Sequence, residues 1–222
     1  MKKMKKLSVM LVCIMLVGLL SGCGNSFDAA GYISAILDNS YKNDSSKFVS
    51  MKIGTAEEAS ETYETSLKGE VDTLIYLSSA GEASDEQYEK LKGIMTDIYG
   101  QTKYTVDGAE KQDDGSYIVT ITYEQINVFG PAMQSYITEL DNLNNEYMST
   151  GEYPSEEELT TILFDTYIGC FEQALANVTF DEPATATIKV ELKDKLWQPN
   201  ENDVLAFETS LFDIDALQEA LQ

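Results

Sequence analysis

The side chains in this sequence that could do chemistry are carboxylates, lysines and three cysteines, because the chain contains neither histidine nor arginine. Without histidine, the commonest general base and metal ligand is missing, and no Ser-His or Cys-His nucleophile pair can form. Without arginine, the bidentate clamp for phosphates is missing. The sequence has no Gly-rich phosphate-binding motif either. We therefore expect a protein that is not an enzyme and that holds neither a cofactor nor a metal ion.

The cysteines differ in their surroundings. Cys13 lies in an apolar N-terminal run, and Cys23 follows that run. Cys170 falls on the apolar stripe of a helical pattern, between Tyr167 and Phe171, where no histidine can activate its thiol. We interpret Cys170 as a buried structural cysteine and expect no disulfide within the folded part of the chain.

Two polar runs, at 38–44 and 200–203, carry the Asp, Asn and Glu oxygens that Ca²⁺ prefers. Neither has EF-hand spacing, because the central glycine and the bidentate glutamate at the last loop position are missing. Asn and Asp between secondary-structure elements are typical of turns and helix caps. We interpret both runs in that way.

The chain has 13 tyrosines and a single tryptophan. Many of the tyrosines fall on strand faces or on apolar helix stripes, namely Tyr104, Tyr117, Tyr123, Tyr136, Tyr147 and Tyr167. Such rings could line a pocket for a small apolar or amphipathic ligand. They could equally form a core whose hydroxyls reach its rim, and we favour the core.

Residues 1–22 have the pattern of an export signal. Four lysines lie within residues 1–6, and a mostly apolar run follows over 7–20. That run is shorter than the roughly 20 residues that span a bilayer, and it has the length of the apolar region of a secretory signal.

The signal ends in Leu20-Ser21-Gly22-Cys23, and this segment resembles the lipobox of bacterial lipoproteins. The resemblance implies that the Cys23 thiol receives a diacylglyceryl group and that a peptidase cuts just before Cys23. Two acyl chains make a stable membrane anchor. The expected division is a signal at 1–22, the lipidated cysteine with a short tether at 23–27, and a single domain at 28–222. The domain would lie on the outer face of the cytoplasmic membrane.

The charge balance restricts the partners. The sequence has 38 acidic residues against 15 lysines, a net charge of −23, and some of the lysines belong to the signal. Such a field argues against nucleic-acid binding, which needs basic side chains to neutralise phosphates. It would attract cations instead. Besides the membrane itself, the expected partners are a cationic peptide, a small ligand or an envelope protein.

These observations favour a non-enzymatic binding or envelope-interaction domain. The alternative is a carboxylate-based envelope hydrolase acting on cell-wall glycan or peptide, because paired carboxylates can hydrolyse glycosidic bonds without histidine. With 38 acids some pair is always present, and a single tryptophan offers few stacking platforms for a polysaccharide. The alternative is therefore less favoured.

Apolar residues recur at helical spacing in several segments, at 28–43, 55–74, 84–100, 133–147 and 155–175. Thr55, Ser84 and Ser155 each stand three residues before a Glu or Gln, which is the capping-box pattern of a helix start. The tail at 203–221 indicates one or two further short helices.

The strand signals are fewer. Alternating residues predict a hairpin over 104–123 with a turn at 113–115 and a solvated outer face, and a strand at 184–193. Gly130-Pro131 indicates the end of the hairpin region, and residues 197–200 indicate the end of the later strand. The expected fold class is α+β, with a small antiparallel sheet of three to four strands packed against about five or six helices.

The layout also supports a family resemblance. The acidic helical start, the Asp-Asp-Gly hairpin, the run Tyr-Pro-Ser-Glu-Glu-Glu-Leu at 153–159 and the late Trp197 before an acidic terminal helix resemble uncharacterised lipoproteins of Gram-positive gut bacteria. This family is known mainly as a domain of unknown function, and the resemblance transfers no catalytic residue. The fold is also similar to the cone-shaped α+β fold of nuclear transport factor 2, which implies a pocket between a curved sheet and helices.

Overall fold

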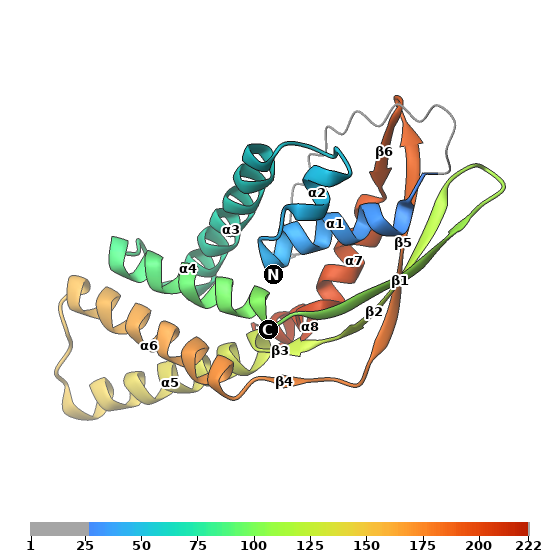
Figure 1. The fold of residues 1–222 in the computed structure, drawn as a ribbon. Coiled ribbons are helices and arrows are strands. Elements are labelled where there is room, and N and C mark those ends of the chain that lie inside the picture. Colours follow the sequence, from blue (N-terminus) through green and yellow to red (C-terminus); the bar gives the residue numbers. More distant parts are fainter. Residues whose placement is uncertain (1–26, 222) are drawn as a thin grey trace.

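The computed structural model describes residues 27–221, in which eight helices pack against a four-stranded antiparallel sheet and a two-stranded ribbon (Figure 1). The helices are α1 (Ala29–Lys42), α2 (Ser46–Ser50), α3 (Ala56–Ser78), α4 (Asp85–Gly100), α5 (Phe129–Thr150), α6 (Glu156–Ala176), α7 (Glu201–Leu211) and α8 (Ile214–Ala220). The strands are β1 (Lys103–Lys111), β2 (Tyr117–Glu124), β3 (Ile126–Asn127), β4 (Thr179–Phe180), β5 (Ala184–Lys193) and β6 (Leu196–Pro199). The predicted α+β fold class is confirmed.

The long helices begin where the sequence predicts. Thr55, Ser84 and Ser155 each accept a hydrogen bond from the backbone N–H three residues on, and the side-chain oxygen of the Glu or Gln at that position accepts one from the backbone N–H of the cap residue. These three capping boxes satisfy backbone donors that the first turn of a helix leaves free. The short helix α2 was not expected, because five residues are too few for a periodic pattern to appear.

The sheet has the strand order β1-β2-β5-β6, and every neighbouring pair is antiparallel. The predicted β1–β2 hairpin turns at Gly115, whose φ of +84° suits glycine. The expectation that residues 197–200 end the strand is wrong, because Leu196–Pro199 forms β6. Asp194 and Lys195 both have positive φ, the geometry of a two-residue hairpin turn that returns the chain beside β5.

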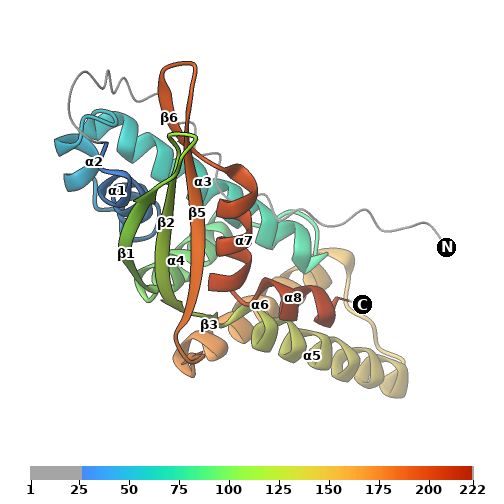
Figure 2. The ribbon, with the colours of Figure 1, turned by 90° about the vertical axis from the view of Figure 1, so that its right-hand side faces the viewer.

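One face of the sheet is buried and the other meets solvent. Val119 and Ile121 of β2 and Ile188 and Val190 of β5 are almost fully buried beneath the helices. The alternate residues on these strands are exposed or half-exposed, as the predicted solvated face requires. Helix α1 packs on β1 and β2, and α7 packs on β5, so these two helices cover the inner face. Figure 2 shows β1, β2 and β5 side by side, with α7 next to β5.

Helix α5 starts in an unexpected place. Gly130-Pro131 was expected to close the hairpin region, but both residues lie in the first turn of α5, where proline is tolerated. Val128 precedes the helix and provides no side-chain cap. Instead the Asp213 carboxylate, just before α8, accepts hydrogen bonds from the backbone N–H groups of Val128, Phe129 and Gly130 at 3.3, 3.1 and 2.8 Å.

Gly130 permits this close approach between α5 and α8. A Cβ at position 130 would lie 2.7 Å from the Ala216 Cβ and 3.1 Å from Asp213 Oδ2. We expect Gly130→Ala to lower the free energy of unfolding by about 1–2 kcal/mol, because overpacking outweighs the gain in helix propensity. The matched control is Gly169→Ala in α6, where an added Cβ meets nothing within 4 Å and stability should rise. Urea denaturation measures both, and equal effects would contradict the packing argument.

Helices α5 and α6 together form an extension of the fold. The buried residues of α5 end at Tyr136, and those of α6 begin at Phe164. Between them, residues 137–163 contain no buried side chain. We call this segment the α5–α6 arm. It extends from the helical layer away from the tip of the β5–β6 hairpin (Figures 1 and 2).

Candidate functional site

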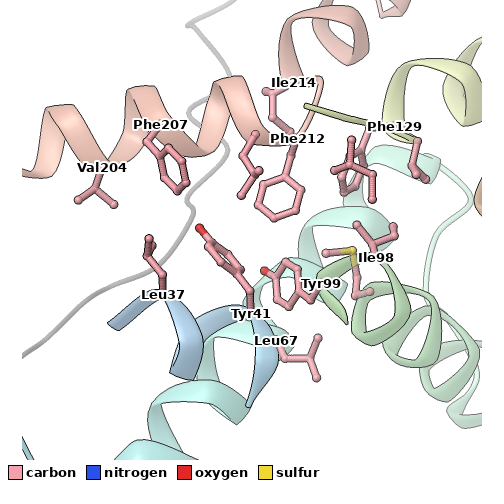
Figure 3. Close-up of a cluster of buried hydrophobic side chains, with 14 of the residues drawn as sticks. Leu37, Tyr41, Leu67, Ile98, Tyr99, Phe129, Val204, Phe207, Phe212 and Ile214 are labelled. Carbon is pink, nitrogen blue, oxygen red and sulfur yellow. The ribbon is translucent and has the colours of Figure 1, made fainter. Parts of the chain in front are cut away.

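The interior contains a group of acidic and tyrosine side chains. We call Tyr41, Glu70, Tyr99 and Glu208 the acid–tyrosine cluster; they come from α1, α3, α4 and α7. The Tyr41 hydroxyl donates a hydrogen bond to Glu208 Oε1 at 3.0 Å. The rings of Tyr41 and Tyr99 meet edge to face at 5.4 Å, and Figure 3 shows them side by side near Phe212.

Two atoms of the cluster lack hydrogen-bond partners among the described residues. These are Glu208 Oε2 and the Tyr99 hydroxyl, and both residues are only 2% exposed. Buried polar atoms without partners are rare and costly in folded proteins. Neither Glu70 nor Glu208 forms an ion pair with a lysine within residues 27–221.

Burial sets the charge of both glutamates. Removal from water raises the pKa of Glu70 to about 8. It also raises the pKa of Glu208 to about 8, helped by repulsion from Glu70 and opposed by the hydrogen bond from Tyr41. At pH 7 both side chains are therefore mostly protonated and neutral. In this state each carboxyl group can donate a hydrogen bond as well as accept one.

A small cavity of about 20 Å³, which is room for about one water molecule, adjoins the cluster. Glu70 and Tyr99 lie on its wall, and Glu208 does not. Most of the remaining lining is apolar, from Leu74, Leu77, Met95, Phe129, Phe212, Ile214 and Leu217. The cavity is far smaller than the pockets of about 300–1,000 Å³ that hold small-molecule ligands. The cavity can therefore accommodate a water molecule beside the neutral carboxyl group of Glu70.

Neither buried glutamate was predicted from the sequence. Glu70 stands three residues after Leu67, and Glu208 stands four residues after Val204, so both occupy core positions of their helical stripes. That positional signal could have identified them among the 38 acids. An acid on an apolar stripe is informative because it is rarely buried without a partner.

The prediction that Cys170 is a buried cysteine of the core is confirmed. Its side chain is 6% exposed in the core, and burial raises the pKa of its thiol. Neither effect favours the reactive thiolate. Cys23 and the signal at 1–22 lie outside the described residues.

The two runs considered for calcium differ from each other. The run at 200–203 provides a helix cap, as predicted. In the run at 38–44, Asn43 is the C-cap of α1 and Asp44 accepts a hydrogen bond from the Ser46 N–H, but residues 38–42 lie within α1 and the prediction of a turn or cap is wrong for them.

Asp38 accepts hydrogen bonds from Lys42, Lys47 and the Tyr104 hydroxyl, which together hold the pKa of its carboxyl group below the usual value despite burial. Asn200 caps α7 by accepting from the N–H groups of Asn202 and Asp203. No three acidic or cysteine side chains within residues 27–221 are placed to hold a metal ion.

Most of the tyrosines singled out in the sequence pack in or against the core, as predicted. Tyr136 donates its hydroxyl to the Ser78 carbonyl and packs edge-on against Tyr167, with ring centroids 4.9 Å apart. Tyr117 is also buried. Tyr147 departs from this pattern: it lies on the α5–α6 arm and pairs with the exposed Tyr153 at 6.0 Å.

The first described residue is held by an aromatic contact. The ring of Phe27 stacks on Trp197 of β6, with centroids 4.3 Å apart and an interplanar angle of 5°. Tyr32 donates its hydroxyl to the Trp197 carbonyl, and Tyr117 packs edge-on against both Phe27 and Trp197. Residues 27–32 are therefore fixed against the sheet at β6.

No protein-family model matches the chain, and no curated protein matches it by sequence. Among solved structures, the chain is similar to the crystal structure of a candidate lipoprotein, YcdA, from Bacillus subtilis. The TM-score is 0.51 and the identity 18%, over 84% of this chain and 56% of that chain. At this identity the likeness concerns the fold alone, and the chain spans little more than half the length of YcdA. The resemblances to gut lipoproteins and to nuclear transport factor 2 stay predictions.

Proposed function

We propose that this chain is an extracytoplasmic lipoprotein, anchored to the membrane through Cys23, whose folded domain binds a partner and catalyses no reaction. The observation that carries the proposal is the sequence Leu20-Ser21-Gly22-Cys23 directly after a basic and an apolar segment. The likeness in fold to a candidate lipoprotein supports the same assignment. Among residues 27–221, no helix combines the length and hydropathy needed to cross a bilayer.

The Phe27–Trp197 stack bears on how the domain sits at the membrane. Phe27 follows Cys23 by four residues, and an extended chain spans at most about 3.6 Å per residue. The Phe27 Cα therefore lies within about 15 Å of the lipidated residue. This short tether would hold the β6 side of the domain close to the lipid head groups.

Replacing Cys23 tests the anchor. We expect Cys23→Ala to abolish lipid labelling and processing at this site, because the alkylated atom is the thiol sulfur. Metabolic labelling with radioactive palmitate and intact-mass analysis measure both effects. Cys170→Ala is the matched control, since that thiol is buried and should carry no lipid. A Cys23→Ala protein that still carried label would refute the anchor.

Binding is better supported than catalysis by the acid–tyrosine cluster. A carboxylate-based glycosidase needs two carboxyl groups that face one substrate. Here Glu70 lines the cavity whereas Glu208 is 2% exposed and does not. We therefore expect no turnover when the protein is incubated with cell-wall glycan or peptide fragments. Turnover that Glu70→Gln abolished would overturn this proposal in favour of an envelope hydrolase.

A further inference from the structure

The α5–α6 arm leaves an apolar seam partly exposed. Its apolar side chains recur at helical spacing on both helices, and all of them are half-buried: Ile137, Leu140, Leu143, Tyr147, Leu159, Ile162 and Leu163. Two paired helices can cover only one side of such a seam, and residues 137–163 receive no full cover from the rest of the domain. Met148 and Tyr153, near the tip, are each 67% exposed.

The seam leads into an open groove at the tip of the arm. The groove has a volume of about 600 Å³, is open to solvent, and lies where α5 turns into α6. Its apolar wall comes from Tyr147, Tyr153, Pro154 and Ile162. Its rim carries Glu152, Glu157 and Glu158. Exposed aromatic rings beside charged side chains are typical of binding surfaces on soluble domains.

The arm carries negative charge and no positive charge. No lysine occurs between Lys111 and Lys189, although lysines are spread through the rest of the chain. The acids of the arm surround the seam and the groove: Glu139, Asp141, Glu146, Glu152, Glu156, Glu157 and Glu158. The ion pairs described for this protein all lie elsewhere, so lysines of the same chain do not neutralise these carboxylates.

We propose that the α5–α6 arm is a docking surface for a cationic amphipathic helix of another polypeptide. The apolar face of such a helix would complete the seam that two helices leave open, as helix-in-groove recognition requires. Its lysines or arginines would meet the acidic rim, which also steers association. This proposal names the class of partner for the binding domain proposed above.

Charge selects this occupant over the other candidates. A second copy of the chain would bring an equally acidic arm against the first, and like charges at an interface cost free energy. Anionic lipid would be repelled for the same reason. The arm also lies at the other end of the molecule from β6, the strand on which Phe27 stacks, so the tether proposed above would leave the arm facing away from the membrane (Figure 1). It is therefore placed to meet polypeptides beyond the membrane surface.

A binding assay on the full chain tests the proposal. The probe is a fluorescently labelled 18-residue peptide of leucine and lysine, with leucines at helical spacing, and the protein is held in a non-ionic detergent. We expect saturable binding that weakens at least tenfold in Tyr153→Ser and in Glu152→Lys/Glu157→Lys. A peptide of the same composition in scrambled order, and one with glutamate in place of lysine, should bind at least tenfold more weakly.

Matched variants separate the arm from general surface properties. Tyr76 of α3 is 71% exposed, so Tyr76→Ser is the control for Tyr153→Ser. Glu57→Lys/Glu61→Lys, at exposed positions of α3, makes the same change in net charge outside the arm. Equal loss of binding in arm and control variants would overturn the proposal. A concentration-dependent dimer that Tyr153→Ser dissolves would assign the surface to a second copy and would likewise overturn it. The peptide affinity does not depend on Cys23, so failure here and failure of the anchor are distinguishable.

Discussion

Glu208→Gln is expected to raise the free energy of unfolding by about 2 kcal/mol at pH 8 and to change it little at pH 4.5. The pKa of Glu208 is about 8 in the folded protein against an ordinary value of 4.5. Between these values the unfolded chain has released a proton that the folded chain retains. Stability of the natural protein therefore falls as pH rises from 4.5 to about 8, and it levels off above that range.

The size of the effect follows from the same pair of values. A rise in pKa from 4.5 to about 8 corresponds to at most roughly 5 kcal/mol. Water entry and relaxation around the ionised group reduce this, so we expect about 2 kcal/mol. Glutamine resembles the protonated acid, keeps an acceptor for the Tyr41 hydroxyl and does not titrate. The stability of the Glu208→Gln variant should therefore not show the fall between pH 4.5 and about 8 that titration of Glu208 causes.

Urea denaturation at a series of pH values from 4.5 to 8.5 measures the difference. Glu70→Gln should act in the same direction, because burial raises the pKa of Glu70 to about 8 as well. Glu61→Gln is the matched control, an exposed acid on the same helix as Glu70. If Glu208→Gln followed the pH profile of the natural protein, the buried acid would not be the source of the pH dependence.

Asp213→Ala is expected to cost about 3 kcal/mol of folding stability, because it leaves several buried backbone donors without a partner. The Asp213 side chain is 2% exposed and accepts from the N–H groups of Val128, Phe129 and Gly130. The substitution also removes negative charge from the N-terminus of α5, where the helix dipole favours it. Burial raises the pKa of this carboxyl group even against those three hydrogen bonds.

Two further variants test this role of Asp213. Asp213→Asn keeps one acceptor oxygen in the same place, so its loss should be clearly smaller than that of alanine. Asp215→Ala removes an exposed acid two residues on, in the first turn of α8, and should change stability by less than about 0.5 kcal/mol. The midpoints of urea denaturation of Asp213→Ala, Asp213→Asn and Asp215→Ala measure these differences in stability. Similar midpoints for Asp213→Ala and Asp215→Ala would show that the cap contributes little.

The sequence predicted the features that depend on neighbouring residues. The capping boxes at Thr55, Ser84 and Ser155 each act over three positions, and all three helices begin there. The alternation at 184–193 likewise reports the two faces of β5. Asn200 acts as the cap that its residue type and position indicate. Local chemistry decides these features, and local chemistry is visible in a sequence.

The features that were missed depend on distant contacts. The cap of α5 comes from Asp213, which is 83 residues beyond Gly130 and leaves no local pattern. The ribbon of β3 and β4 has two residues in each strand, too few for an alternating pattern to appear. Glu70 and Glu208 are buried because four helices meet around them. A sequence shows that they occupy stripe positions, but not that tyrosines and another acid surround them.

The lysine-free stretch that includes the α5–α6 arm has a consequence for proteolysis. Projecting surface segments are normally the first to be nicked. Trypsin-like proteases cleave after lysine or arginine, and residues 112–188 contain neither. The most exposed pair of helices therefore offers such proteases no scissile bond, and a complete tryptic digest would release residues 112–189 as one fragment. Amine-reactive cross-linkers would also leave the arm unlabelled, whereas a glutamate-specific protease should cleave it readily.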